Sequence, residues 1–193
     1  MGDLQDRLDA AEIKNRLNNW VAVTVALISV FMAVTKVKDD NIVQAMLQHK
    51  SDAVDSWNEY QSKKLKHHMA ELGLSQTQAL QLFAPEKARA QLDAQLKQYR
   101  DMIVRYQGEE EVLMKKAKGH EKAYDDLNYR DDQFDLSDAA LSICLGMLAV
   151  ASLTNKRRLL YLSWVFAAFG LVMGVAGLLG LALHPDSLAK LLS

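Results

Sequence analysis

The sequence predicts an all-α membrane protein: three transmembrane helices and a long antiparallel helical hairpin, a coiled coil, outside the membrane. Three observations predict this fold. Of the 193 residues, 50% are hydrophobic and 24% are charged, but the two kinds are separated along the chain. Three apolar segments carry no charge over lengths that are rare in soluble domains. Between the first and second of them lies a charged region whose apolar residues recur at helical spacing.

The three apolar segments predict helices that cross a membrane. A crossing of about 30 Å needs about 20 apolar residues, and the segment 159–183 exceeds that length. The segments 20–35 and 139–154 are shorter, but Lys36 can reach the headgroups and Ser137 can cap a helix N-terminus. The predicted parts are a cytoplasmic segment at 1–19, transmembrane helices at 20–37, 136–154 and 159–184, an extramembrane hairpin at 38–135, a basic turn at 155–158 and a C-terminal tail at 185–193.

Basic residues in the short connections predict the orientation of the chain. Short loops rich in Lys and Arg stay in the cytoplasm. The turn between the last two segments reads NKRR, and the N-terminal flank adds three basic residues, whereas the C-terminal tail offers only Lys190. We therefore expect the N-terminus and this turn in the cytoplasm, with the hairpin and the C-terminus on the other side. Lys36 and Lys38, beside the first segment, count against this orientation.

Small residues recur along one face of each of the last two segments. The stripes are Ala139, Ser142, Gly146 and Ala149 in one, and Ala167, Gly170, Gly174 and Gly177 in the other. Small side chains let two helix backbones approach closely in lipid. We expect the two stripes to pack on each other within one chain. The alternative is that the GxxxG face of the last segment forms a contact between subunits.

The charged central region predicts two helices that fold back on each other. Residues 39–72 contain no Pro or Gly and repeat apolar residues at helical spacing. Gly73 is expected to end this helix, and a capping-box pattern predicts a short helix at 75–83. Pro85 would then open a second long helix with a heptad repeat, so that the chain reverses at 73–85.

The expected seam of the hairpin contains more apolar and aromatic residues than two helices can bury. Its proposed members are Trp57, Tyr60, Leu96, Tyr99, Ile103, Tyr106, Glu110 and Leu113. Because a hairpin exposing such broad faces would be sticky, we expect a homo-oligomer held by the hairpins. A carboxylate at a heptad core position needs a partner, and for Glu110 we expect Tyr60, Lys63 or Lys64.

Chemical motifs are sparse, so the sequence predicts no catalytic residue, no cofactor and no metal. A phosphate-binding glycine loop, a nucleophile elbow and a clustered Cys/His pattern are all missing. The net charge of −1 argues against nucleic acid as a partner, and the uncharged span cores argue against a pump. His49 and His120, with a nearby acid, could form a two-helix metal site, but solvated or core-lining histidines are the expected state.

The order of the segments resembles a known family. Residues 55–67 read DSWNEYQSKKLKH, and they lie between one span and a long second helix that leads to two spans split by basic residues. This arrangement resembles a family of bacterial membrane proteins described only as a domain of unknown function, with Trp57, Tyr60, Gln61 and Lys66 as the most distinctive matches. The resemblance supports this architecture, implies a bacterial membrane protein and adds no reaction. Combined with the orientation expected from the basic residues, it gives a multi-pass protein of the bacterial inner membrane with its hairpin in the periplasm.

We expect a non-enzymatic, membrane-anchored helical scaffold or accessory subunit that self-associates through its coiled-coil rod. Its expected partners are membrane lipid, further copies of itself and a larger membrane complex. The alternative is a homo-oligomeric channel or conduit, whose pore would be lined by Thr24, Ser29 and Thr35. An enzyme is a third class that no residue pattern supports.

Overall fold

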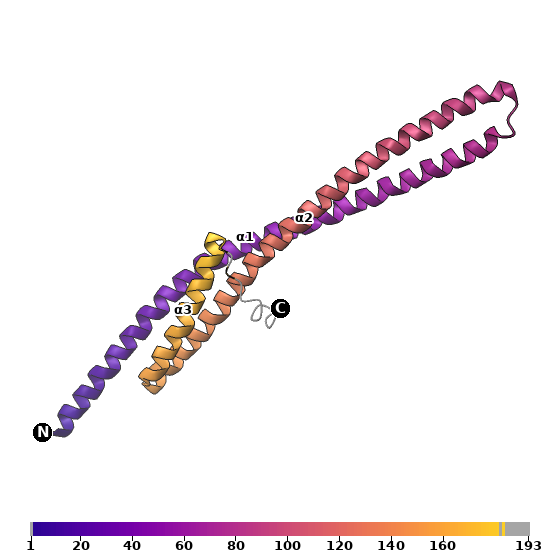
Figure 1. Ribbon diagram of the computed structural model, residues 1–193. Helices are drawn as coiled ribbons and strands as arrows, with labels where there is room; N and C mark the ends of the chain where they lie inside the picture. Colours follow the sequence, from indigo (N-terminus) through magenta and orange to yellow (C-terminus); the bar gives the residue numbers. More distant parts are fainter. Residues whose placement is uncertain (1, 182, 184–193) are drawn as a thin grey trace. The chain divides into compact units, whose positions relative to one another are not determined.

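The structure is a computed structural model that describes residues 2–181 and 183 (Figure 1). It consists of three helices: α1 (Gly2–Gln81), α2 (Glu86–Thr154) and α3 (Arg157–Leu179). The described residues contain no strand. All three helices include a segment that is long and apolar enough to cross a membrane. The all-helical prediction is therefore confirmed.

The chain divides into two compact units, and α1 and α2 each contribute to both. The first unit, called the bundle here, comprises residues 1–45 and 126–193, and the second, called the hairpin, comprises residues 46–125. The bundle contains the apolar segments of all three helices. The hairpin contains the charged region, and α1 and α2 pair there in antiparallel directions (Figure 1).

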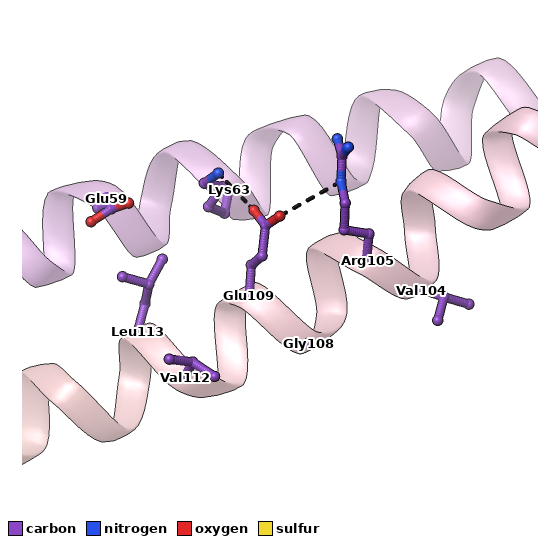
Figure 2. A pocket seen from close by; sticks show the side chains of 8 residues that line it. All are labelled: Glu59, Lys63, Val104, Arg105, Gly108, Glu109, Val112 and Leu113. Carbon is purple, nitrogen blue, oxygen red and sulfur yellow. Dashed lines mark ion pairs between the residues drawn. The ribbon is translucent and has the colours of Figure 1, made fainter.

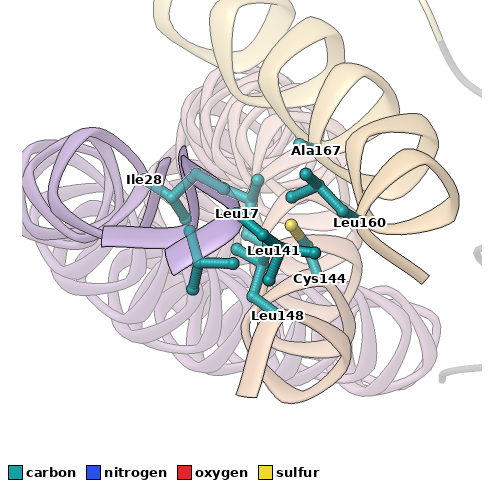
Figure 3. Close-up of a cluster of buried hydrophobic side chains, with 8 residues drawn as sticks. Leu17, Ile28, Leu141, Cys144, Leu148, Leu160 and Ala167 are labelled. Atoms are coloured by element: carbon teal, nitrogen blue, oxygen red, sulfur yellow. The ribbon is translucent and has the colours of Figure 1, made fainter. Parts of the chain in front are cut away.

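The core of the bundle is formed by apolar side chains from all three helices. Figure 3 shows Leu17 and Ile28 of α1 meeting Leu141, Cys144 and Leu148 of α2, together with residues of α3. The full cluster of buried residues is Leu17, Val21, Ile28, Leu141, Cys144, Leu148, Leu160 and Ala167. Because neighbouring members of this cluster are three, four or seven positions apart on each helix, they lie on one face of that helix.

The small-residue stripe of α3 is buried, and it receives large side chains from the neighbouring helices. A Cβ added to Gly170 would lie 2.7 Å from Cγ of Leu141, and one added to Gly174 would lie 2.7 Å from the ring of Phe31. At Gly177 the ring of Phe134 would be 3.0 Å away. These glycines therefore allow α1 and α2 to pack closely on α3.

The stripe of α2 is placed differently from our expectation. Ser142, Gly146 and Ala149 are exposed, Ala139 is half-buried, and a Cβ added to Gly146 would meet nothing within 4 Å. The expectation that the two stripes pack on each other is therefore wrong. Instead, the small face of α3 receives Leu141 and other large side chains, which fill the space beside its glycines.

Polar side chains of α2 bind the C-terminal end of α3. Arg130 donates to the carbonyl of Gly177 from Nε at 3.2 Å and from Nη2 at 2.9 Å. Gln133 donates from Nε2 to the carbonyls of Leu181 and Leu183, at 2.8 and 2.6 Å. The last carbonyls of a helix have no partner within that helix, so these two side chains supply partners for backbone groups at its end.

Two local predictions are wrong because both residues lie inside longer helices. Gly73 does not end the first helix, since α1 continues to Gln81. A Cβ on Gly73 would lie 2.6 Å from the ring of Tyr99, so this glycine makes room for an aromatic side chain of α2. Ser137 does not cap a helix; it lies within α2 and its Oγ donates to the carbonyl of Gly170 at 2.7 Å.

The connections between the helices are short. Residues 82–85 join α1 to α2, and the amide of Ala88 donates to the carbonyl of Pro85 at 2.9 Å. Asn155 and Lys156 join α2 to α3, with Asn155 in the left-handed region at φ 57°, a conformation that Asn tolerates. The other two basic residues of the NKRR sequence form the start of α3.

Candidate functional site

The two helices of the hairpin are joined by polar and aromatic side chains that reach from α1 to α2. Farthest from the tip, Nδ1 of His49 lies 3.2 Å from Nδ1 of His120, and Nε1 of Trp57 donates to Oε1 of Glu121 at 2.8 Å. In the middle, Nζ of Lys63 lies 2.6 Å from Oε2 of Glu109, and Nδ1 of His67 lies 2.9 Å from Oε1 of Glu110. Nearest the tip, Nε2 of Gln81 donates to Oδ1 of Asp93 at 2.5 Å. These pairs fix the register of the two helices over the whole length of the hairpin.

The predicted seam residues differ in their burial. Leu96 and Leu113 are buried, whereas Trp57, Tyr60, Tyr99, Ile103, Tyr106 and Glu110 are half-buried. On α1 the buried positions include Ser56, His67 and Ala70, which we did not single out as seam residues. Small and polar residues give a weak periodic signal. Only their three- and four-residue spacing, in line with Ala53, could have indicated them.

Glu110 pairs with His67, and not with the expected Tyr60, Lys63 or Lys64. The imidazole of His67 is buried, and Lys63 instead forms its ion pair with Glu109. Side chains lean toward the N-terminus of their own helix. Because α1 and α2 are antiparallel, Glu110 leans toward the tip and His67 leans away from it. The side chains of Glu110 and His67 therefore meet although the Cα atom of His67 lies closer to the tip than that of Glu110.

A groove of about 510 Å³ lies along the hairpin (Figure 2). Val104, Gly108 and Val112 of α2 line it at four-residue spacing, so they lie on one face of the helix. A Cβ added to Gly108 would meet nothing within 4 Å. Figure 2 shows the charged border of the groove, where Glu109 pairs with Lys63 and with Nε of Arg105 at 3.6 Å. The groove is thus apolar along one helix and charged beside it.

Aromatic and basic side chains gather at one end of the bundle. A cavity of about 350 Å³ there is lined by Arg16, Arg157 and the rings of Trp20, Tyr161 and Trp164, together with leucines. The ring of Trp164 meets that of Trp20 edge to face, with centroids 6.0 Å apart. Trp, Tyr and Arg are the side chains typical of a membrane–water interface.

Acidic side chains gather where α1 and α2 leave the bundle. Asp39 is buried, and its Oδ2 lies 2.8 Å from Nζ of Lys36. Burial, a hydrogen bond to Asp39 and the negative charge of Asp135 raise the pKa of Asp131 to about 7. Burial, followed by the charges of Asp39 and Asp132, also raises the pKa of Asp135. Near neutral pH, the carboxyl group of Asp131 is therefore partly protonated and partly ionised.

The residues proposed to line a pore lie in different environments. Thr24 is half-buried, donates to the carbonyl of Trp20 at 2.7 Å and accepts from Nε1 of Trp164 at 3.3 Å. Thr35 is buried, and its hydroxyl lies within bonding distance of the carbonyls of Phe31 and Met32. Ser29 is exposed. The structure does not bring these three hydroxyls together on one open face.

Comparison with known proteins identifies the family of the chain. The family model described as a domain of unknown function (DUF4337) matches residues 17–180, which include most of α1 and all of α2 and α3. No curated protein and no solved structure matches the chain. Because the matched region covers most of the sequence, the chain belongs to the DUF4337 family.

Proposed function

We propose that the protein is a non-enzymatic, membrane-anchored scaffold or accessory subunit, which self-associates through its hairpin. One observation carries this proposal. The outer faces of α1 and α2 within the hairpin are apolar and exposed, and they lie at the same level along it. A second copy of the chain is the occupant that best fits such a pair of faces.

Each of the two outer faces carries a stripe of exposed apolar residues. On α1, Leu65, Met69 and Leu72 are exposed by 63, 63 and 58%. On α2, Val104 and Val112 are exposed by 69 and 66%, and the exposed Gly108 lies between them. Apolar surface in water costs about 25 cal/mol per Å². Removing both stripes from water therefore favours association.

The register of the hairpin places the two stripes at one level. Lys63 lies opposite Glu109, and Gly73 lies opposite Tyr99. Leu65 is therefore level with residues near Gly108. Hairpins that lie side by side and point the same way have equivalent residues at one level. The α1 stripe of one copy can then meet the α2 stripe of the next, with Leu65 directed toward the space above Gly108.

The proposed membrane location follows the same logic. We infer a multi-pass protein of the bacterial inner membrane, with the N-terminus and the turn at Asn155 in the cytoplasm and the hairpin in the periplasm. Arg16 and Arg157, beside the aromatic rings of the bundle, support a cytoplasmic membrane surface at that end. Lipid, other copies of the chain and a larger membrane complex are the proposed partners.

A scaffold is favoured over a channel by the hydroxyl groups of the bundle. Thr24 and Thr35 use their hydroxyls in bonds within the chain. Conductance in reconstituted bilayers separates the two functions. A steady single-channel current from the purified protein would replace the scaffold with a channel.

A leucine in the groove tests the association surface. Gly108→Leu adds a side chain where the chain has open space, so the hairpin should fold as before. The leucine would block the side chain of the neighbouring copy. Light scattering of the full chain in a mild detergent should report an oligomer for the natural sequence and smaller particles for Gly108→Leu.

Gly119→Leu is the matched control, because a Cβ there also meets nothing within 4 Å and the same helix carries it. This variant should assemble as the natural chain does. A monomeric natural chain at micromolar concentration, or equal assembly of both variants, would contradict the proposed surface.

Disulfide cross-linking tests the pairing of the two stripes. In a Cys144→Ser background, Leu65→Cys combined with Gly108→Cys should give covalent dimers upon oxidation. Leu65→Cys combined with Lys122→Cys is the control. Lys122 is exposed on α2, but it lies 14 residues, or about 21 Å, further along the helix than Gly108. Equal cross-linking by both pairs would show random collision instead of a defined interface.

A further inference from the structure

Three possible metal ligands meet in the hairpin, at the end opposite its tip. His49 and Asp52 lie on α1 at a spacing of three residues, so they share one face of that helix. His120 of α2 faces them, with its Nδ1 3.2 Å from Nδ1 of His49 and 3.9 Å from Oδ2 of Asp52. One ligand atom from each residue lies within 4.8 Å of the other two.

These distances fit the coordination sphere of a small transition-metal ion. Zinc binds His nitrogen and carboxylate oxygen at about 2.0–2.2 Å in tetrahedral geometry, which places neighbouring ligand atoms about 3.3 Å apart. The two imidazole nitrogens are already at that separation. Asp52 has to bring its carboxylate closer to both rings: Oδ2 is 3.9 Å from Nδ1 of His120, and the ligand atoms of the three residues lie within 4.8 Å of one another. Its side chain, 36% exposed, is free to make this movement.

The surroundings of the three residues also suit a bound ion. Nε2 of Gln48 donates to Oδ1 of Asp52 at 2.9 Å, and this bond leaves Oδ2 directed toward the two rings. Such a second hydrogen bond orients a carboxylate ligand. All three ligand residues are half-buried, and the side chain of His120 is 23% exposed. An ion can therefore enter, and water can occupy the fourth position.

We propose that His49, Asp52 and His120 form a site for one divalent transition-metal ion, best matched by Zn²⁺, which clamps α1 to α2. Two imidazoles and one carboxylate are a donor set that zinc uses when a fourth position stays open to water. Mg²⁺ and Ca²⁺ prefer oxygen donors and are excluded by the two nitrogens. The clamp concerns contacts within one chain, so it does not depend on self-association.

Zinc titration of the full chain tests this site. The protein is prepared without an affinity tag, freed of metal by a chelator and kept in detergent. Calorimetric titration with Zn²⁺ should give one ion per chain. Because the folded hairpin alone brings the three ligands together, zinc should also raise the melting temperature, and more so at higher zinc concentration.

Ligand variants decide whether these residues hold the ion. His120→Ala and, separately, His49→Gln should each weaken zinc binding by about tenfold or more, with the helical circular dichroism signal retained. His68→Ala is the matched control, because His68 is exposed and pairs with Glu71 on its own helix; it should bind zinc as the natural chain does.

Three results would overturn the proposal. The first is a natural chain that takes up no zinc. The second is binding of equal affinity in His120→Ala, which would place the ion elsewhere. The third is one ion per two chains, which would indicate bridging between surface histidines of different copies.

Discussion

The bundle and the hairpin are built from the same two helices, yet they join those helices by different means. In the bundle, glycines of α3 admit Leu141, Phe31 and other large side chains at short range. In the hairpin, long polar and aromatic side chains reach across from α1 to α2. Gly108 and Gly119 of the hairpin meet nothing within 4 Å of an added Cβ. Glycine thus has a packing role along the buried stripe of α3 in the bundle, and in the hairpin it has one at Gly73, beside Tyr99, but not at Gly108 or Gly119.

The difference fits the proposed location of the bundle in a membrane and of the hairpin in water. Between helices in lipid there is no hydrophobic driving force, so close backbone packing and hydrogen bonds such as Ser137 to Gly170 would stabilise the contact there. In water, helices can be joined by charged pairs because exposed ends of the side chains remain hydrated. A large side chain at the buried stripe of α3 should therefore destabilise the fold strongly, whereas one at Gly108 or Gly119 of the hairpin should have little effect.

The largest expected effect is that of Gly170→Leu. Its side chain would overlap Leu141 and approach the backbone carbonyl of Ser137, which lies 3.0 Å from the Cβ position and cannot move alone. We expect a loss of about 3 kcal/mol in the free energy of unfolding. Thermal unfolding of the full chain in detergent, followed by circular dichroism, measures this loss.

Gly146→Leu provides the control in the same part of the molecule. Gly146 is exposed on α2 and an added Cβ meets nothing within 4 Å. The variant should unfold at the temperature of the natural chain or slightly above it, because leucine favours a helix more than glycine does. Equal losses in both variants would mean that the buried stripe of α3 has no special packing role.

A smaller effect is expected when the buried pair of the hairpin is broken. Glu110→Ala leaves the imidazole of His67, which is 8% exposed, without its 2.9 Å partner. An unsatisfied buried polar group costs about 2 kcal/mol. Glu111→Ala removes a 2.7 Å ion pair with Lys115 in which both side chains are mostly exposed, and water screens such pairs so that they add little to stability. Chemical denaturation of both variants should rank them in this order; a reversed order would contradict it.

Much of the fold could be predicted from the sequence, because its main signals are long and periodic. Uncharged segments indicate the three apolar helices, and three- and four-residue repeats indicate the hairpin. Residue types that usually mark helix ends predicted the helix boundaries less well. Gly73 and Ser137 carry the residue types of helix ends, but tertiary contacts with Tyr99 and Gly170 explain them better. A single residue type cannot distinguish a cap from a close contact between helices.

The side-chain pairs were harder to predict than the helices. The spacing of the stripes shows which residues share a face, but not which face turns inward. The orientation of α2 is decided by Leu141, Cys144 and Leu148, which fill the bundle core, so that Gly146 is turned outward. Similarly, the partner of Glu110 depends on the lean of both side chains, and a register counted in Cα positions misses His67.

The smallest expected effect is a pH dependence of stability that comes from an acidic residue of the bundle. The pKa of Asp131 is raised to about 7 by burial, by a hydrogen bond to Asp39 and by neighbouring carboxylates. In the unfolded chain an aspartate loses its proton near pH 4. Between about pH 4 and pH 7 the folded state therefore binds more protons than the unfolded state, and stability must fall as pH rises through this range. Asp131 is only partly buried, so water reduces the effect to about 1 kcal/mol.

Asp131→Asn tests this pH dependence, since an amide keeps the shape of the side chain and cannot ionise. The melting temperature of the natural chain should decrease between pH 5 and pH 7.5, and the decrease should be smaller in Asp131→Asn, with a remainder from the raised pKa of Asp135. Asp101→Asn, at an exposed position of the hairpin, should retain the full decrease. If Asp131→Asn also retained it, the proton would be held elsewhere, and the acidic end of the bundle would tolerate full ionisation at neutral pH.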